Sequence, residues 1–395
     1  MRNSPGLPIL VAGGGIGGLT AALCLAQQGF EVQVFEQVAA FSEVGAGIQL
    51  SPNCTRVLHD LGLEAALLRH AFVPEGVEMR DWKSGRVLFR NPLGETARRT
   101  FGFPVYHVHR ADLVEVLVEA ARAEPRITLQ AGARVTSVDQ AADSVTVQAG
   151  GVRHVGALLV GADGIHSATR AAMFGADAPT FTGCVAWRGL VPADRLPTGL
   201  VRPMATAWWG PGKHFVHYYL RRGELVNCVC IVEKDGWEIE SWTERGESGE
   251  LKRDFAGWHD DLQRLLEAMD PDSCFKWALL DRPPMPRWSD RRVTLLGDAC
   301  HPTLPFLAQG AAMAIEDGAV LARYLARGAD VPASLARYES LRHDRTANIQ
   351  AGSRRNKTLF HLGGARARVR NLVAGPLQRR VIRGLFGYDA LAAAS

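Results

Sequence analysis

The chain has 395 residues, 47% of them apolar and 22% charged, with a formal net charge of +4. This composition is typical of a folded globular protein, and it excludes disordered, collagen-like and disulfide-stapled chains. The small net charge argues against a nucleic-acid binder. The seven cysteines are scattered without a CxxC pair, which indicates a cytoplasmic protein in a reducing compartment. We expect no integral membrane association, because no apolar run could span a bilayer and the N-terminal residues show no signal-peptide pattern.

The chain opens with the pattern of a βαβ unit. The apolar run 7–12 is followed by GGGIGG, a helical stretch and a second strand that ends in Glu36. Gly13, Gly15 and Gly18 match G-x-G-x-x-G, in which the glycines allow a tight turn, approach of a pyrophosphate and close helix–strand packing. The helix N-terminus offers N–H groups to phosphates, and a carboxylate at Glu36 can accept both hydroxyls of a ribose. The sequence therefore predicts a dinucleotide site without separating FAD from NAD.

Alternating helical and extended patterns follow this unit. We expect a helix over 54–70, a hairpin over 77–90, a helix over 111–123, short strands over 127–149 and an apolar strand at 157–160.

The middle of the chain, from about 181 to 280, is rich in Trp, Tyr and Val with alternating polarity, which predicts an antiparallel sheet. A strand at 292–296 and a long helix near Gln309 follow, and the last fifty residues read as arginine-rich helices broken at Gly363. The predicted fold class is α/β: a Rossmann-like dinucleotide-binding domain with an inserted, mainly antiparallel β-sheet substrate domain and a C-terminal helical tail. The predicted boundaries are 1–180 for the first domain with insertions near 70–105, 181–285 for the sheet domain, 286–330 for the resumed first domain and 331–395 for the helical region.

Two later motifs favour FAD over NAD. Asp163 lies in GADG after an apolar strand, and Asp298 lies in LGDACHP after another. A carboxylate at a strand end next to a small residue suits a ribityl chain, and the helix N-terminus after Gly310 suits the flavin's pyrimidine edge. The alternative for Asp163 is a buried structural ion pair with Arg170.

These motifs together carry a family resemblance. GGGIGG with Glu36, HRADL at 109–113, GADGIHSATR and LGDACHPTLPFLAQGAAMAIEDG follow one another over nearly all of residues 8–325. The set resembles the single-component flavin-dependent aromatic hydroxylases, and EVGAGIQ at 43–49 with SPN at 51–53 is similar to the salicylate, 3-hydroxybenzoate and 6-hydroxynicotinate hydroxylases.

The resemblance implies a monooxygenase that uses FAD, NADH (or NADPH) and O2 to hydroxylate a phenolic aromatic acid through a flavin C4a-hydroperoxide. A salicylate- or hydroxybenzoate-type acid is favoured, and a 6-hydroxynicotinate-type or other N-heteroaromatic substrate is the alternative. An NAD-dependent dehydrogenase or a catalytically decayed flavin-binding protein are more distant alternatives. The FAD-binding residues that the resemblance implies are Gly13, Gly15, Gly18, Glu36, Gln37 (where the family often has Arg), Gly47, Arg110, Val135, Asp163, Asp298 and Gly310.

The strand predicted over 212–220 carries the candidate catalytic residues. Alternation places His214 and Tyr218 on one face and His217 and Tyr219 on the other. The related hydroxylases have a His-x-x-x-Tyr pair in this strand, which implies His214 as the base and Tyr218 as the residue that orients the substrate. Histidine suits this role because its ordinary pKa is about 6.5.

Three further residues are candidates for substrate binding. The resemblance places Gln49 beside the substrate, where the 6-hydroxynicotinate enzymes tend to have His, and Pro305 near the flavin, where salicylate-type enzymes share the proline and 3-hydroxybenzoate 6-hydroxylases have Gln. Arg188 could pair with a substrate carboxylate or be structural. We expect no metal at Cys300 and His301, since no third ligand accompanies them. The arginine-rich C-terminal helices read as a solvated face, with lipid headgroups or a homodimer contact as alternatives.

Overall fold

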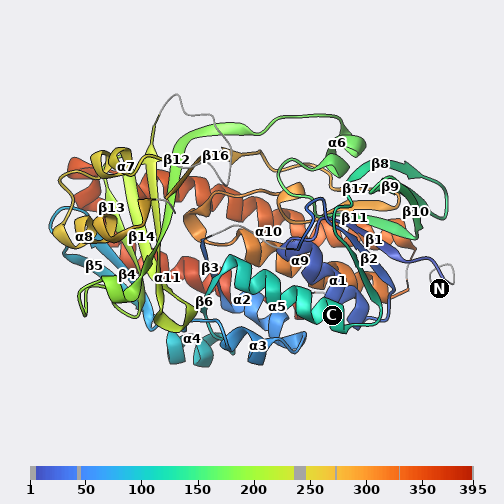
Figure 1. Cartoon of the computed structure of the whole chain (residues 1–395), viewed down its shortest axis with the longest axis horizontal. Coiled ribbons are helices and arrows are strands. Elements are labelled where there is room, and N and C mark those ends of the chain that lie inside the picture. The colour runs from blue at the N-terminus through green and yellow to red at the C-terminus, as the bar shows by residue number, and fades with distance from the viewer. Residues whose placement is uncertain (1–5, 42–45, 235–245, 272–273, 329, 394–395) are drawn as a thin grey trace.

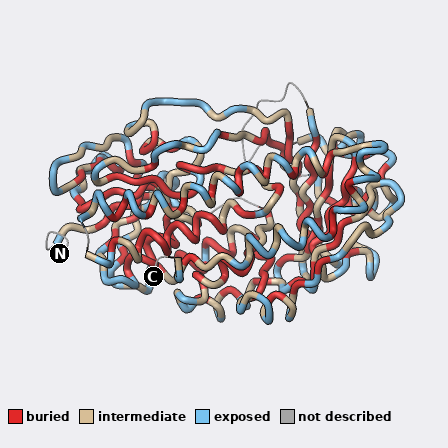
Figure 2. The backbone as a smooth tube through the Cα atoms, turned by 180° about the vertical axis from the view of Figure 1, so that it is seen from behind, coloured by how far each residue is buried: buried red, intermediate tan, exposed pale blue. Residues whose placement is uncertain are grey.

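The computed structural model describes residues 6–41, 46–234, 246–271, 274–328 and 330–393. Figure 1 shows an elongated molecule with one large β-sheet towards each end and long helices between them. The buried parts of the chain run through both sheets and through these central helices (Figure 2). The fold class predicted from the sequence is confirmed.

The first large sheet carries the nucleotide-binding pattern. Its six strands are ordered β17-β18-β11-β1-β2-β7, and neighbours are parallel except β17 and β18. β1 and β11 are apolar and buried along their whole length, as expected of parallel strands covered on both faces. The strands are β1 (Ile9–Ala12), β2 (Val32–Phe35), β7 (Ile127–Gln130), β11 (Leu158–Gly161), β17 (Ser289–Asp290) and β18 (Val293–Leu295).

Helices cover one face of this sheet, and a small antiparallel sheet covers the other. Ile9 and Val11 pack against α1 (Ile16–Gln27), α5 (Arg110–Ala123) and α9 (Gly310–Ala326). The small sheet has the order β10-β9-β8. Its strands are β8 (Val135–Gln140), β9 (Val145–Ala149) and β10 (Val152–Gly156).

The crossing of α1 and α9 depends on one glycine. A Cβ at Gly318 would lie 3.0 Å from the Cα and N atoms of Ala21. Because two helix backbones approach this closely, α9 is fixed against α1, and the N-termini of both helices are held relative to the sheet.

The second large sheet has seven strands in the order β16-β12-β15-β14-β13-β4-β5, and β13 with β4 is its one parallel pair among the described residues. Phe215 packs on the face covered by α7 (Ser248–Asp254) and α8 (Asp260–Ala268). The opposite face contacts Phe306, which precedes α9, and Phe360, the last residue of α10 (Val331–Phe360). The strands are β4 (Gly76–Asp81), β5 (Val87–Pro92), β12 (Thr180–Pro192), β13 (Met204–Gly210), β14 (Lys213–Leu220), β15 (Leu225–Glu233) and β16 (Phe275–Asp281).

The hairpin expected over 77–90 is confirmed as β4 and β5, and it extends the second sheet. The helical segment expected over 54–70 is found, but as two helices, because the chain turns at Gly62, where φ is +75°. The remaining connecting elements are β3 (Gly47–Leu50), α2 (Pro52–Asp60), α3 (Glu64–Leu68), α4 (Gly94–Phe101), β6 (Tyr106–His109) and α6 (Ala168–Phe174).

The C-terminal region is helical, as expected. α10 (Val331–Phe360) runs between the two large sheets, Gly363 caps the next helix α11 (Gly364–Phe386), and α12 (Ala390–Ala393) ends the described chain (Figure 1). α11 exposes arginines together with apolar side chains such as Leu372, which is 82% exposed. None of the described helices has the length and hydropathy required to cross a membrane.

Candidate active site

The glycine loop after β1 is shaped by close backbone packing. Gly13 has φ +105°, and a Cβ there would overlap the carbonyl of Ala162. A Cβ at Gly18 would overlap the carbonyl of Gly13. Gly15 precedes α1, and no described side chain caps this helix or adds an acidic group to its first turn. The loop therefore leaves the positive end of α1 open to an anionic group.

Glu36 directly follows β2 beside this loop. One carboxylate oxygen accepts from the backbone N–H of Gly14 at 2.7 Å, and the other accepts from the N–H of Val38 at 3.0 Å. Gln37 follows on the exposed surface. Val135 begins β8 nearby, since the N–H of Ala133 donates to the carbonyl of Glu36 at 2.7 Å. The structure thus brings the residues predicted for the adenosine half to one end of the first sheet.

Arg110 and Asp298 interact across this region from different elements. Burial lowers the pKa of the Arg110 guanidinium, and the charge of Asp298 raises it. The Asp298 side chain keeps an open surface, yet burial raises the pKa of its carboxyl against the opposite effects of His301 and Arg110. Both observations fit a carboxylate that lies among protein charges and that a polar ligand can still reach.

Asp163 holds the chain that leads into α6. Its carboxylate accepts from the Ser167 hydroxyl at 2.5 Å and from the Thr169 N–H and hydroxyl at 2.9 and 3.0 Å. Arg170 pairs instead with Asp177 and donates to the carbonyl of Ala299 at 2.9 Å. The alternative of an Asp163–Arg170 ion pair is therefore wrong, and Arg170 ties the GADG segment to the GDAC turn.

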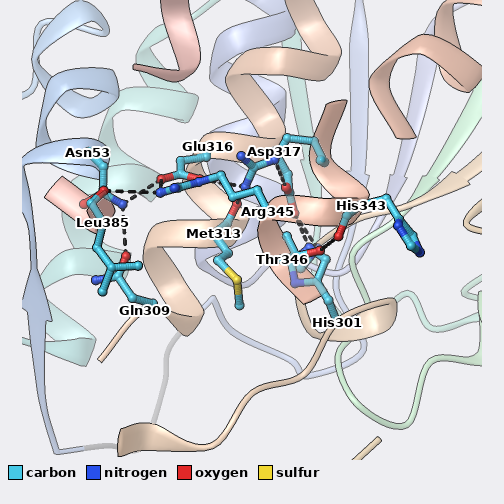
Figure 3. A network of polar contacts seen from close by, with 12 residues as sticks. Asn53, His301, Gln309, Met313, Glu316, Asp317, His343, Arg345, Thr346 and Leu385 are labelled. Atoms are coloured by element: carbon cyan, nitrogen blue, oxygen red, sulfur yellow. Dashed lines mark hydrogen bonds and ion pairs between the residues drawn. The ribbon is translucent and has the colours of Figure 1, made fainter. Parts of the chain in front are cut away.

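A buried network of charged side chains contacts the turn at residues 297–300, called the GDAC turn (Figure 3). His301 Nε2 lies 2.6 Å from one Asp317 oxygen, which also accepts from the Gly297 N–H at 3.1 Å. Arg342 donates to the other Asp317 oxygen at 2.7 Å. His301 therefore acts as a partner of Asp317, and among the described residues no three His, Cys, Asp or Glu side chains gather as a metal site. Burial raises the pKa of the Cys300 thiol well above its usual value, which makes it a poor nucleophile.

The same network fixes the start of α9 at Gly310. Gln309 donates to the Ser51 hydroxyl at 3.0 Å, and Asn53 donates to Gln309 at 3.0 Å and to Glu316 at 2.6 Å (Figure 3). Sequence analysis did not single out Gln309 or Glu316 as site residues, because their partners lie more than 250 positions away along the chain. No described side chain caps α9, so its N-terminus also remains open to an electron-rich group.

The predicted alternation of β14 is confirmed. Phe215 and Tyr219 pack with the helices α7 and α8 on the outer face, and His217 accepts from the Trp208 indole at 3.1 Å. His214 and Tyr218 lie on the opposite face, which looks towards the first sheet and α10.

Tyr218 lies against β3, the strand that bears Gln49. A Cβ at Gly47 would lie 2.7 Å from the Tyr218 ring, so only glycine lets β3 pass this close. The Gly47 N–H donates to Asn227 on β15 at 2.8 Å, a contact that no sequence pattern indicated. Burial raises the pKa of the Tyr218 hydroxyl, and the nearby Arg188 charge and the Gln49 side chain lower it. Tyr218, Gln49 and Arg188 are therefore neighbours, as the sequence analysis required. In the related EVGAGIQ motif, residues 43–45 lie outside the described residues.

His214 is surrounded by aromatic rings and by a second histidine. Its ring lies 5.2 Å from Phe306 and 5.4 Å from Phe360, and its Nδ1 lies 2.8 Å from His361 Nε2. Pro305 begins the short turn that presents Phe306. Sequence analysis missed His361, which is 147 positions from His214 and belongs to no motif.

The residues present fit FAD. The glycine loop excludes side chains, the N-termini of α1 and α9 carry no side-chain cap, and the Asp298 carboxylate interacts with the Arg110 guanidinium. A dinucleotide with two phosphates and a polar ribityl chain matches this set of donors and acceptors.

The comparisons with known proteins agree with this geometry. Residues 7–353 match the family model described as FAD binding domain. A 3-amino-4-hydroxybenzoate 2-monooxygenase from Streptomyces platensis is 40% identical over 387 residues, which cover 97% of this chain and 96% of that protein. The chain belongs to the FAD-dependent aromatic hydroxylases. A 3-hydroxybenzoate 6-hydroxylase from Polaromonas naphthalenivorans is 39% identical to this aromatic hydroxylase, over 93% of this chain and 92% of that protein.

A solved structure extends the likeness to the whole fold. Klebsiella pneumoniae HpxO, complexed with FAD and uric acid, is 31% identical with a TM-score of 0.83, and the match covers 98% of this chain and 97% of that one. The predicted family, enzyme class and FAD cofactor of this aromatic hydroxylase are thus confirmed. The dehydrogenase alternative leaves the Asp298 turn and the open end of α9 without a role.

Proposed function

We propose that this enzyme uses NAD(P)H and O2 to hydroxylate a phenolic aromatic acid of the salicylate or hydroxybenzoate type. The observation that carries the proposal is the inner face of β14 and β12, where His214, Tyr218 and Arg188 supply a base, a hydroxyl and a cation opposite the cofactor loop. A phenolic acid offers a proton, a hydroxyl oxygen and an anion to match them.

His214 is the group that takes the phenolic proton. Burial lowers its pKa well below the usual value, so the imidazole is neutral and keeps a lone pair at neutral pH. Tyr218 remains protonated because burial raises its pKa, and it can therefore donate a hydrogen bond to the phenolate that forms. Removing the proton makes the ring electron-rich, which is what an electrophilic oxygen donor requires.

Arg188 holds the substrate carboxylate. Burial lowers the pKa of its guanidinium to about 10, which still leaves it cationic at neutral pH. Its guanidinium carbon lies 4.7 Å from the centre of the Trp277 ring, which fixes the direction of the side chain. A carboxylate that accepts two N–H groups from a buried guanidinium gains both affinity and orientation.

The residues around the dinucleotide site bind FAD, and those next to His214 exclude water from the substrate. The residues that bind the dinucleotide directly are Gly13, Gly15, Glu36, Arg110 and Asp298. The residues that shape the binding site around them are Gly18, Gln37, Val135, Asp163 and Gly310. Bound FAD, once reduced by NAD(P)H, supplies an activated oxygen atom from O2. Phe306 and Pro305 line the region between His214 and α9 and keep water from the reacting ring. NADH or NADPH acts as a transient co-substrate, since the chain has no second glycine motif for a separately bound nucleotide.

A nitrogen heteroaromatic is the second candidate substrate, and the similarity to HpxO complexed with uric acid favours it. Gln49 beside Tyr218 supports the benzoate class instead, because that position tends to carry His in the 6-hydroxynicotinate enzymes.

The seven cysteines are all buried and form no disulfide, which supports a location of this enzyme in the reducing cytoplasm.

The test is NADH oxidation by the FAD-loaded enzyme with salicylate, 3-hydroxybenzoate, 4-hydroxybenzoate and 6-hydroxynicotinate, with products identified by mass spectrometry. One of the three benzoates should stimulate oxidation and yield a hydroxylated product. Turnover of 6-hydroxynicotinate alone would select the second candidate, and oxidation without product from every acid would contradict both.

A further inference from the structure

Three side chains from three elements form a continuous chain of contacts from the inner face of the second sheet to the surface. His214 Nδ1 lies 2.8 Å from His361 Nε2, and His361 Nδ1 lies 2.7 Å from a Glu233 carboxylate oxygen. His214 is 3% exposed and His361 8%, whereas the Glu233 side chain is 45% exposed. A buried base is thus connected to solvent through one buried ring and one carboxylate.

The carboxylate decides where the ring protons lie. An ionised carboxylate only accepts, so His361 must carry its proton on Nδ1 and offer a lone pair at Nε2. That lone pair accepts the Nδ1 proton of His214, which leaves the Nε2 lone pair of His214 available. Glu233 therefore fixes the tautomer of both histidines in the state that a base at the substrate requires.

The electrostatics explain why His214 needs such a connection. Phe306 and Phe360 give it an apolar environment, in which an imidazolium would be costly. His361 is buried as well, and the cations Lys357 and Arg370 lower its pKa further, while the Glu233 carboxylate raises it. A positive charge that arrives on His214 can be stabilised only if it moves towards Glu233.

The contacts are not needed to hold α10 on the sheet. The backbone N–H of Gly212, which precedes β14, donates to the carbonyl of His361 at 3.0 Å. Gly363 also packs on Pro211, where an added Cβ would lie 3.2 Å from the proline ring. Main-chain contacts therefore hold the end of α10 on the sheet. The His361 side chain is not required for that packing, and it contacts His214 instead.

We propose that His361 and Glu233 are positioning residues that carry the proton taken by His214 to solvent, an inference that rests on the proposed function. The phenolic O–H bond breaks and its proton binds His214 Nε2. The Nδ1 proton of His214 passes to His361 Nε2, and the Nδ1 proton of His361 passes to Glu233 and then to water. The return of one proton along the same path to the product oxygen restores both tautomers, so the cycle is balanced.

The experiment compares wild-type holoenzyme with His361→Gln and Glu233→Gln. The first variant keeps an acceptor for His214 but interrupts proton transfer, and the second keeps the shape of Glu233 but removes its charge. Glu224→Gln is the matched control, because Glu224 is exposed and directly precedes β15 at the end opposite Glu233. Each protein is measured for product formed per NADH from pH 4.5 to 9, so that the acidic limb is covered, and for histidine tautomers by 15N NMR, which needs no turnover.

We expect hydroxylation to fall about 10- to 100-fold in His361→Gln and about tenfold in Glu233→Gln, with FAD content and substrate Kd unchanged within about twofold. Because the Glu233 carboxylate raises the pKa of His361, its removal should move the acidic limb of the pH profile to lower pH. NMR of the wild type should show the His214 proton on Nδ1, and Glu224→Gln should match the wild type.

Normal yields and pH profiles in both variants, or a His214 proton on Nε2, would overturn the relay while leaving the proposed function in place. If no aromatic acid is hydroxylated, the proposed function fails, and the NMR tautomers and their loss in Glu233→Gln then decide whether the hydrogen-bonded chain exists. A merely structural role for His361 would lower FAD content and stability without moving the pH profile.

Discussion

Replacing Asp317 with Asn tests the buried charges beneath the cofactor site. Asp317 is completely buried, and its carboxylate meets Arg342 at 2.7 Å, His301 at 2.6 Å and the Gly297 N–H at 3.1 Å. The substituted side chain would keep the shape but lose the charge, and its amide NH2 would face at least one donor. Arg342, which is also completely buried, would retain Glu316 at 2.7 Å as its anionic partner among the described residues.

Two routes give the size of the effect. Breaking a buried ion pair by removal of one partner costs about 3–5 kcal/mol. Independently, burial raises the pKa of the Asp317 carboxyl, but His301 and Arg342 outweigh this effect and lower it from 3.8 to about 2. A shift of that size corresponds to about 2 kcal/mol of preference for the charged form. We therefore expect Asp317→Asn to lower the free energy of unfolding by about 3 kcal/mol.

The assay is urea unfolding of both apoproteins at pH 7, with Asp344→Asn as the control. Asp344 lies on α10 with its side chain 93% exposed, so its loss should change stability by no more than about 0.5 kcal/mol. Because the folded pKa of Asp317 is depressed, its contribution is complete above pH of about 4 and is lost as the pH falls towards 2. The difference in free energy of unfolding between wild type and Asp317→Asn should therefore decrease as the pH falls over that range. A decrease in the free energy of unfolding of less than about 1 kcal/mol at pH 7, or a difference between the two proteins that does not change with pH, would refute the reasoning.

Three further predictions concern the cofactor and substrate. Gly18→Ala should abolish flavin binding, because the added Cβ would overlap the glycine-loop backbone. Gly384→Ala is the control and should retain FAD, because the added Cβ would meet only open space. The flavin absorbance of each variant after desalting measures the FAD that it retains. Arg188→Met should raise KM for the aromatic acid about 10- to 100-fold, by loss of a charge-assisted hydrogen bond, without changing KM for the phenol that lacks the carboxylate. Tyr218→Phe should lower product per NADH at least about tenfold, while Tyr219→Phe, on the outer face, should not; coupled oxygen-uptake and product assays measure both.

Local patterns predicted the parts of the site that depend on neighbours in sequence. The glycine loop, the acidic end of β2 and the alternation of β14 follow from backbone geometry over a few residues, and each is found in the structure. The family motifs singled out Asp298 and Arg110, which lie far apart in the chain but belong to recognisable segments; their interaction with each other appears only in the structure.

Contacts between remote residues without a motif could not be predicted. His361 reaches His214 only because α10 runs between the two large sheets and ends beside β14 (Figure 1). The Asp163–Arg170 pair failed for a related reason: Asp163 finds closer donors at the start of α6, and Arg170 turns towards the GDAC turn. Helix length and side-chain competition decide such contacts, and neither is visible in a single sequence.

The most direct test of the central claim is hydroxylation under 18O2 by wild type and by His214→Asn, both loaded with FAD. The wild type should oxidise NADH only when the aromatic acid is present and should insert one 18O atom into the product ring. His214→Asn should bind FAD and substrate normally but lose at least about tenfold in labelled product per NADH. Unlabelled product from the wild type, or equal labelling by both proteins, would contradict the account.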